Sequence, residues 1–238
     1  MKPKILIVIL VLGALFAGAG FFLYRCGSEP GWGAAPAGVV PTMDLAALQA
    51  SAGQGDPAAQ TRLARIFLEG TVTNRNIKEA VKWLRQETNQ DYPDALAAWG
   101  ELTQAGQGVP KNLAEAVRVY QSAGEKGSVA AQYDLAFLYE QGSGVKKDRQ
   151  QAAKWYQLAA EGGDPLAQFD IGQRYALGVG VTTNRVEAFK WLALAAAAGQ
   201  PDSAKLLSEL KRQMSGDELT QAAQLVRQFS PRTANPAH

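Results

Sequence analysis

The side chains best suited to catalysis are few in this chain. Its 238 residues include one histidine, His238, and one cysteine, Cys26. The single histidine is the last residue, so we expect no histidine base and no zinc cluster, and the single cysteine lies beside the predicted membrane segment. Carboxylates such as Asp134, Glu140 and Asp170 are the remaining acid–base candidates, but acids scattered along helices usually form solvated faces. The sequence predicts no enzymatic activity, no cofactor and no metal site.

Glycine-rich turns followed by lysines are the second candidate for chemistry, as phosphate loops. Lys111 follows the turn that begins at Gly106, and Lys146 and Lys147 follow the turn that begins at Gly142. Neither turn contains the Gly-Lys-Ser/Thr sequence that a phosphate loop needs. The same turn also recurs along the chain, so we interpret it as structural.

The elements that position these residues repeat every 36 residues. Three sets of landmarks share this period without insertions: Gly70, Gly106, Gly142 and Gly178; Ala80, Ala116, Ala152 and Ala188; Ala59, Ala95, Ala131 and Ala167. A period between about 20 and 50 residues indicates a repeat architecture.

One unit, residues 131–163, predicts a pair of helices. Apolar residues from Ala131 to Tyr139 follow the 3.6-residue helical period. Gly142 is expected to end this first helix, because glycine adopts the left-handed conformation without a Cβ clash. Asp148 is expected to cap a second helix, with Asn76, Asn112 and Asn184 at the equivalent positions of the other copies.

The pattern A-x-A-Q-aromatic, then Tyr, G-x-G-V, Asp/Asn, A-x-x-W and A-A-x-x-G resembles the Sel1-like repeat, a relative of the tetratricopeptide repeat. Copies 129–164 and 165–200 match it well. Copy 93–128 departs at Trp99, Thr103 and Val119, and copy 57–92 is the most divergent. A divergent first copy is expected of a terminal repeat, since one of its faces has no neighbour.

The resemblance implies an all-α fold, a right-handed superhelical α-solenoid of helix–turn–helix repeats, and a role in protein–protein interaction. In related folds the first helices line the concave side. Their residues outside the core are our candidates for binding a protein partner: Arg62, Arg65, Ala98, Glu101, Asp134, Gln141, Asp170 and Gln173. Tyr133 and Phe169 occupy a position that is usually aromatic in the repeat, so packing is expected there. An envelope enzyme or cell-wall-binding protein using groove carboxylates is the alternative.

The N-terminus predicts a membrane anchor. Residues 5–24 carry no charge, and as a helix they would extend about 30 Å, the thickness of a bilayer's hydrocarbon core. Lys2 and Lys4 precede this run, so the positive-inside rule predicts a cytoplasmic segment 1–4, an inner-membrane signal anchor 5–25 and a periplasmic remainder in a bacterium. The alternative is a cleaved signal peptide, since Ala17-Gly18-Ala19 fits a cleavage site, which would leave a soluble periplasmic binder.

Cys26 follows the apolar run, but Tyr24 and Arg25 precede it where a lipoprotein signal needs small residues. As the single cysteine it permits only an intermolecular disulfide. Together with the small-residue pairs of the apolar run, such as Gly13 and Ala17, it makes a homodimer an option.

The rest of the chain divides by composition. We expect a flexible linker at 26–43, an N-terminal capping helix at 44–56 with Asp44 as its cap, capping helices at 201–230 and a disordered tail at 231–238. Lys2, Lys4 and Arg25 contribute three charges to a net charge of +2, so everything after them sums to −1. A nearly neutral body predicts no binding to nucleic acid.

Overall fold

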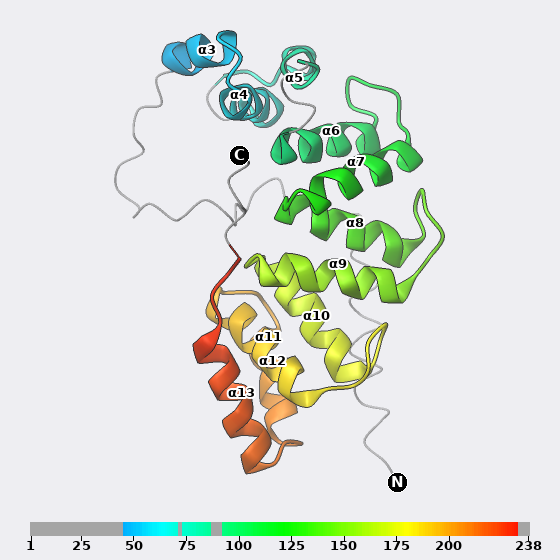
Figure 1. The fold of residues 1–238 in the computed structure, drawn as a ribbon, viewed down its shortest axis with the longest axis vertical. Coiled ribbons are helices and arrows are strands. Elements are labelled where there is room, and N and C mark those ends of the chain that lie inside the picture. Colours follow the sequence, from blue (N-terminus) through cyan, green and yellow to red (C-terminus); the bar gives the residue numbers. More distant parts are fainter. Residues whose placement is uncertain (1–44, 71–72, 87–91, 233–238) are drawn as a thin grey trace. The chain divides into compact units, whose positions relative to one another are not determined.

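A computed structural model describes residues 45–70, 73–86 and 92–232. The chain divides into two units, 1–39 and 40–238, and the described residues all belong to the second. Every regular element among them is an α-helix (Figure 1). None of these helices combines the length and apolarity that a membrane crossing requires. The predicted anchor at 5–25 and linker at 26–43 lie outside the described residues.

Four helix pairs form the repeats, as predicted. They are α4 (Pro57–Glu69) with α5 (Ile77–Leu84), α6 (Pro93–Ala105) with α7 (Leu113–Glu125), α8 (Val129–Gln141) with α9 (Arg149–Glu161), and α10 (Pro165–Leu177) with α11 (Arg185–Ala197). The two helices of each pair pack together, and the second helix of one pair packs against the first helix of the next. This nearest-neighbour packing is what a repeat array requires.

The helix ends use the residues that the sequence indicated. Asn76, Asn112, Asp148 and Asn184 each accept hydrogen bonds from backbone N–H groups in the first turn of a second helix. At the other end, Gly70, Gly106, Gly142 and Gly178 close the first helices in the left-handed conformation, with φ of 70–73°. The recurring glycine is therefore a helix terminator.

The second glycine of the turn has a packing role. Gly144 and Gly180 have φ of +74° and +76°, and a Cβ at these positions would lie 2.4 Å from the carbonyl oxygen of Leu113 and 2.0 Å from that of Arg149, respectively. Each turn thus rests directly on the second helix of the preceding repeat. This contact explains the turn without any bound phosphate.

The core consists of small residues between the helices and large residues between the repeats. The two alanine landmarks of each copy are at most 5% exposed, and Trp155 and Trp191 are buried. Three buried glutamines, Gln60, Gln132 and Gln168, donate to carbonyl oxygens of the preceding helix at 2.9, 2.9 and 3.3 Å. Each of these carbonyl groups also accepts from a backbone N–H group three residues further on, so the glutamine adds a second hydrogen bond at a helix C-terminus.

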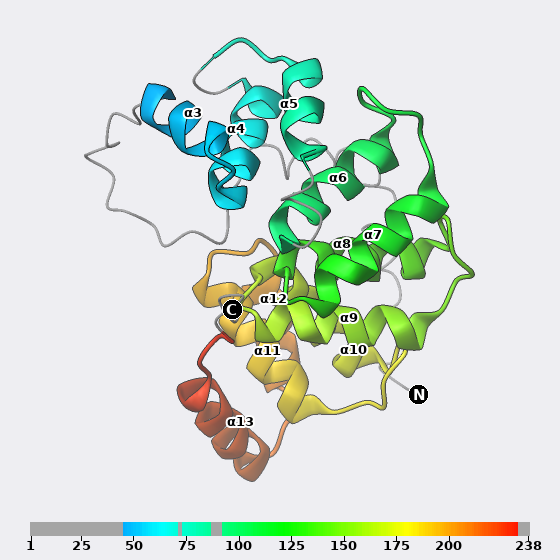
Figure 2. The ribbon, with the colours of Figure 1, turned by 45° about the horizontal axis from the view of Figure 1, so that its top comes forward.

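Capping helices flank the array. Helix α3 (Leu45–Gly53) packs on α4 through Ala52, Leu45 and Leu48; its predicted cap, Asp44, lies outside the described residues. At the other end α12 (Ser203–Lys211) and α13 (Gly216–Gln228) pack on α11 (Figure 2). Ser215 and Glu218 form a capping box at the start of α13.

Two boundaries at the C-terminal end differ from the expectation. Helix α12 begins at Ser203 and not at the start of the predicted span 201–230, because Asp202 has φ of 64°, outside the helical range. The predicted tail also makes contacts at its start. The backbone N–H of Arg232 donates to the carbonyl oxygen of Glu161 at 2.8 Å, and its guanidinium pairs with the Glu161 carboxylate at 2.9 Å.

Candidate partner-binding surface

The eight residues predicted to bind a partner occupy four different environments. Arg62 and Gln141 are exposed on α4 and α8, and Asp134 and Gln173 are half-buried on α8 and α10. These four side chains are accessible from solvent on the first helices of their repeats.

Arg65 and Glu101 pair with each other. Their side chains, each 37% exposed, form an ion pair of 3.7 Å that joins α4 to α6. Exposed ion pairs contribute little stability, typically about 0–1 kcal/mol. Both residues therefore remain available to a partner that offers opposite charges.

Ala98 was wrongly placed on the binding surface. It is fully buried in a core cluster with Ala64, Ala80 and Leu102. A methyl side chain does not hold neighbouring helices apart, so their atoms close over it. The equivalent positions in the next two repeats hold Asp134 and Asp170, which remain partly exposed.

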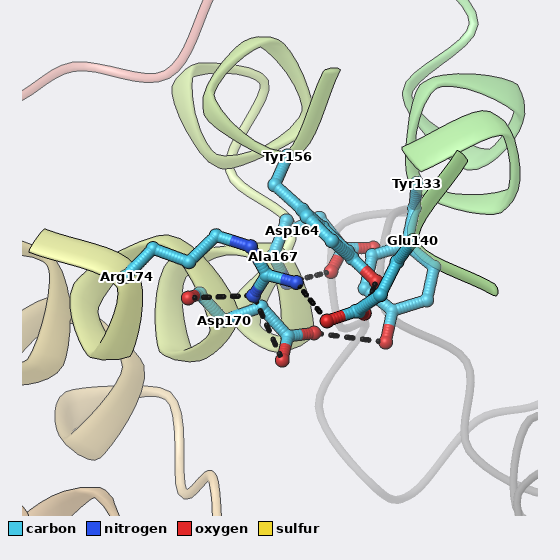
Figure 3. Close-up of polar contacts among 7 residues, drawn as sticks. All are labelled: Tyr133, Glu140, Tyr156, Asp164, Ala167, Asp170 and Arg174. Carbon is cyan, nitrogen blue, oxygen red and sulfur yellow. Dashed lines mark hydrogen bonds and ion pairs between the residues drawn. The ribbon is translucent and has the colours of Figure 1, made fainter. Parts of the chain in front are cut away.

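Asp170 lies in a cluster of polar side chains between the third and fourth repeats (Figure 3). Its carboxylate accepts a hydrogen bond of 3.1 Å from the hydroxyl of Tyr133 on α8. The hydroxyl of Tyr156 on α9 donates to Glu140 on α8, also at 3.1 Å. The two tyrosine rings meet edge to face at 5.3 Å. The role in packing predicted for Tyr133 is confirmed, since it is 2% exposed.

Arg174 joins these groups. It is 6% exposed, forms an ion pair with Glu140, and donates to the backbone carbonyl of Asp170 at 3.1 Å. Its guanidinium lies over the ring of Tyr156, 4.3 Å from the centroid, and its Nε has no hydrogen-bond partner. A single buried cation thus serves two carboxylates and an aromatic ring.

Sequence reasoning did not identify Arg174 or Tyr156, although the repeat contains a signal for the arginine. The residues at the position of Arg174 in the other copies are Ile66, Leu102 and Leu138, all apolar. A cation at a position that is aliphatic in the other copies must either be buried in the core or disrupt the packing of the repeat. A search for such departures from the 36-residue pattern would have found it.

The electrostatics of the cluster follow from one cation among two acids. Burial is the main effect and raises the pKa of Asp170 to about 7. The positive charge of Arg174 and the hydrogen bond from Tyr133 lower this pKa, whereas the negative charges of Glu140 and Asp164 raise it. Burial, with the charges of Asp170 and Glu140, also holds the pKa of Tyr156 well above its usual value. The cluster is therefore close to electrically neutral when Asp170 is protonated.

This pKa predicts a dependence of stability on pH. An unfolded aspartate titrates near about 3.9. The folded chain therefore binds this proton more tightly, so Asp170 contributes stability at pH 4 that is lost as the pH rises through about 7. We expect the free energy of unfolding to fall between pH 5 and pH 8 by an amount on the order of 2 kcal/mol more in the native chain than in Asp170→Asn. Urea denaturation across this pH range measures the difference.

Tyr133→Phe is the companion variant. It removes a hydrogen bond that favours the ionised form of Asp170, so the pH-dependent loss of stability should move to higher pH. Equal pH profiles for the native chain and Asp170→Asn would contradict the assignment.

The cluster acts as a structural contact between repeats. Both carboxylates are held by a tyrosine and by Arg174, and the side chains fill the space between α8, α9 and α10 (Figure 3). Within residues 45–70, 73–86 and 92–232, no group of three His, Cys, Asp or Glu side chains is placed to hold a metal ion.

Comparisons with known proteins agree with this geometry. The family model of the Sel1 repeat matches residues 57–86, 93–128, 129–164 and 165–200. The crystal structure of a Sel1 repeat protein from Oxalobacter formigenes is 32% identical, with a TM-score of 0.65 and 78% of each chain covered. A protective antigen of uropathogenic Escherichia coli with an SLR fold is 28% identical, with a TM-score of 0.51, and the match covers 78% of this chain and 48% of that one.

Another relative matches a shorter stretch of the chain. An uncharacterized protein of Neisseria meningitidis serogroup B is 31% identical over 87 residues, which are 37% of this chain and 19% of that protein.

Proposed function

This chain belongs to the Sel1 repeat family, and from that premise we propose that its repeat array binds another protein and acts as an interaction scaffold. The observation that supports this most is the contrast between the two sides of each first helix. The buried alanines recur in all four copies. In contrast, one partly exposed position of the first helix holds a different residue in each copy: Arg65, Glu101, Phe137 and Gln173. A surface that varies on a constant framework is suited to recognising one particular partner.

The enzymatic alternative has less support. Glu101 is paired with Arg65, and Asp170 is held by Tyr133 within the interface between repeats. Tyr133 and Glu140 lie beside Asp170, but both make contacts that join α8, α9 and α10. The scaffold function therefore explains more of the observed geometry.

Site-directed photo-crosslinking tests the scaffold function. A photoreactive amino acid at Gln141 and, separately, at Gln173 is expected to capture the same protein in native cells, because both side chains reach the first-helix surface. The same amino acid at Gln221, an exposed position on α13, is the control and should not capture it. Identical adducts from all three positions, or none from the first two, would count against this surface.

We also propose that residues 5–25 anchor the chain in a bacterial inner membrane with the repeats in the periplasm. The uncharged run of 20 residues and the preceding Lys2 and Lys4 support this location. Homodimers through the apolar segment or Cys26 remain part of the proposal. Labelling of Cys26 by a membrane-impermeant maleimide in spheroplasts should succeed, and the mass of the mature chain distinguishes an anchor from a cleaved signal.

A further inference from the structure

The turns and second helices concentrate positive charge that the net charge of the chain conceals. Four equivalent windows of 13 residues, 73–85, 109–121, 145–157 and 181–193, contain twelve of the 24 Lys and Arg residues but four of the 22 Asp and Glu residues. The rest of the chain holds the other twelve cations and eighteen acids. The 36-residue period thus segregates charge by position within the repeat.

Eleven of these twelve cations are exposed, and we call them the basic face: Arg75, Lys78, Lys82, Arg85, Lys111, Arg118, Lys146, Lys147, Arg149, Lys154 and Arg185. The four carboxylates neutralise few of them. Three form ion pairs within their own helix, with Lys82, Arg118 and Lys190, and the fourth caps α9. In the part of the chain that the structure describes, Lys111, Lys146 and Lys147 have no carboxylate at ion-pair distance.

Part of the basic face lies on turns that are stacked from repeat to repeat. The turns of the second, third and fourth repeats lie along one side of the array, on the right in Figures 1 and 2. Gly144 and Gly180 hold two of these turns against the preceding second helix, and Arg75 reaches Gln107 of the next turn at 3.0 Å. Adjacent layers of packed helices are about 8–10 Å apart, so neighbouring cations can meet one extended anionic surface.

Three of the cations have side chains that start from equivalent positions in their turns. The Cβ atoms of Arg75, Lys111 and Lys147 each lie against the glycine that ends the first helix, within 3.2 Å of where its own Cβ would be. Their side chains therefore start from equivalent positions in successive repeats. A spacing fixed by the fold distinguishes this row from lysines scattered over a surface.

Helix stability accounts for only some of these charges: Lys82 and Arg85 lie at the C-terminus of α5, where a cation is favourable, and Arg185 pairs with Glu218 at 3.8 Å. Arg149 and Arg185 are the first residues of α9 and α11, and Lys147 precedes the cap of α9. The N-terminus of a helix carries partial positive charge, so a cation there is unfavourable and an acid is preferred. The basic face thus opposes the helix dipole at several positions, which suggests that it serves a partner.

We propose that the basic face docks on the anionic headgroups of a lipid bilayer. Its cations spread over four layers, which fits a broad anionic surface better than a small ligand. Basic side chains gather at anionic membrane surfaces, and the attraction falls off within a Debye length. The proposal rests on the proposed anchor. Together with the linker 26–43, whose r.m.s. reach would be about 21–25 Å, the anchor would keep the repeats near the membrane and so raise the effective concentration of lipid.

The test uses the full chain with Cys26→Ser and one fluorophore at Ala114→Cys, an exposed position of α7 within the basic face. Energy transfer to headgroup-labelled lipid is measured in vesicles of phosphatidylcholine alone and in vesicles with added phosphatidylglycerol. Transfer should rise at least about twofold with the anionic lipid, and the rise should disappear near 0.5 M salt, where the Debye length is short. A label at Gln224→Cys on α13 should show no such rise.

A matched pair of variants assigns the effect to the basic face. Lys146→Gln/Lys147→Gln should lose about half of the lipid-dependent transfer. Lys205→Gln/Arg212→Gln, which removes an exposed cation of α12 and an exposed cation at its C-cap, should lose none. Equal transfer in neutral and anionic vesicles, or equal loss in both variants, would overturn the proposal. Salt-sensitive binding to a DNA duplex without any lipid effect would assign the face to nucleic acid instead.

Flotation with neutral vesicles separates the two proposals. If the anchor fails, the chain does not float with phosphatidylcholine vesicles, yet salt-sensitive flotation with anionic vesicles still supports docking by the basic face. If docking fails, the chain floats with both kinds of vesicle and the transfer from Ala114→Cys does not respond to anionic lipid.

Discussion

Replacing Gly180 with alanine is expected to lower the free energy of unfolding by about 2–5 kcal/mol. The residue has φ of +76°, and an added Cβ would lie 2.0 Å from the carbonyl oxygen of Arg149 and 2.7 Å from its carbonyl carbon. The conformational term accounts for about 1–2 kcal/mol and the displaced backbone for about 1–3 kcal/mol. Urea denaturation followed by circular dichroism measures the loss.

Gly199→Ala is the matched control. Gly199 also has positive φ, +81°, but no atom lies within 4 Å of an added Cβ. This variant should therefore lose only the conformational term, about 1–2 kcal/mol. If both variants lost the same amount, the contact between the turn and the preceding second helix would not contribute, and the role given to Gly180 would be wrong.

The repeat pattern predicted the elements of the fold because capping and packing depend on residue type at fixed spacing. Gly142 ends α8 and Asp148 begins α9 for local reasons that are visible in a single copy. The stacking of consecutive pairs also followed from the period, since each pair has more apolar surface than it buries alone. The start of α12 did not follow, because it depends on the left-handed backbone of Asp202.

The binding surface was harder to predict, because exposure is a tertiary property. Ala98 and Asp170 occupy equivalent positions in their repeats, yet one is in the core and the other is held by Tyr133 of the neighbouring repeat. Helical periodicity gives the direction of a side chain but not the size of the side chains that approach it. The polar cluster needs contacts between residues 34 to 37 positions apart, which no local pattern encodes.

The net charge of the chain did not predict how the charges are distributed over its surface. A sum over the whole sequence suggested a nearly neutral body, but the sum ignores position within the repeat. When residues are grouped by their place in the 36-residue period, Arg75, Lys111 and Lys147 fall in one column. The segregation of charge within the repeat was therefore present in the sequence, and the stacking of the turns showed that it produces the basic face.

The polar cluster predicts a second large effect, at Arg174. Arg174→Leu should lower the free energy of unfolding at pH 7 by about 3 kcal/mol, because it leaves the Glu140 carboxylate without its cation in a mostly buried site. The estimate is at the lower end for a buried pair, since the Glu140 side chain is 30% exposed and retains some water. Loss of Arg174 also removes a charge that lowers the pKa of Asp170, so that carboxyl should remain protonated to higher pH.

The preceding interface shows how the loss can be reversed. There Gln104 and Leu138 occupy the positions of Glu140 and Arg174, and the hydroxyl of Tyr120 donates to Gln104 at 3.0 Å as Tyr156 donates to Glu140. The double variant Glu140→Gln/Arg174→Leu copies this arrangement and should recover most of the stability that Arg174→Leu loses.

A double-mutant cycle measured by urea denaturation gives the coupling between the two positions. We expect a coupling free energy of about 1–3 kcal/mol, because the two residues touch and each loses its nearest opposite charge when the other is replaced. Strictly additive losses in Glu140→Gln, Arg174→Leu and the double variant would contradict the ion pair as an energetic unit. They would show instead that the packing of α9 against α10 holds the third and fourth repeats together without a contribution from this ion pair.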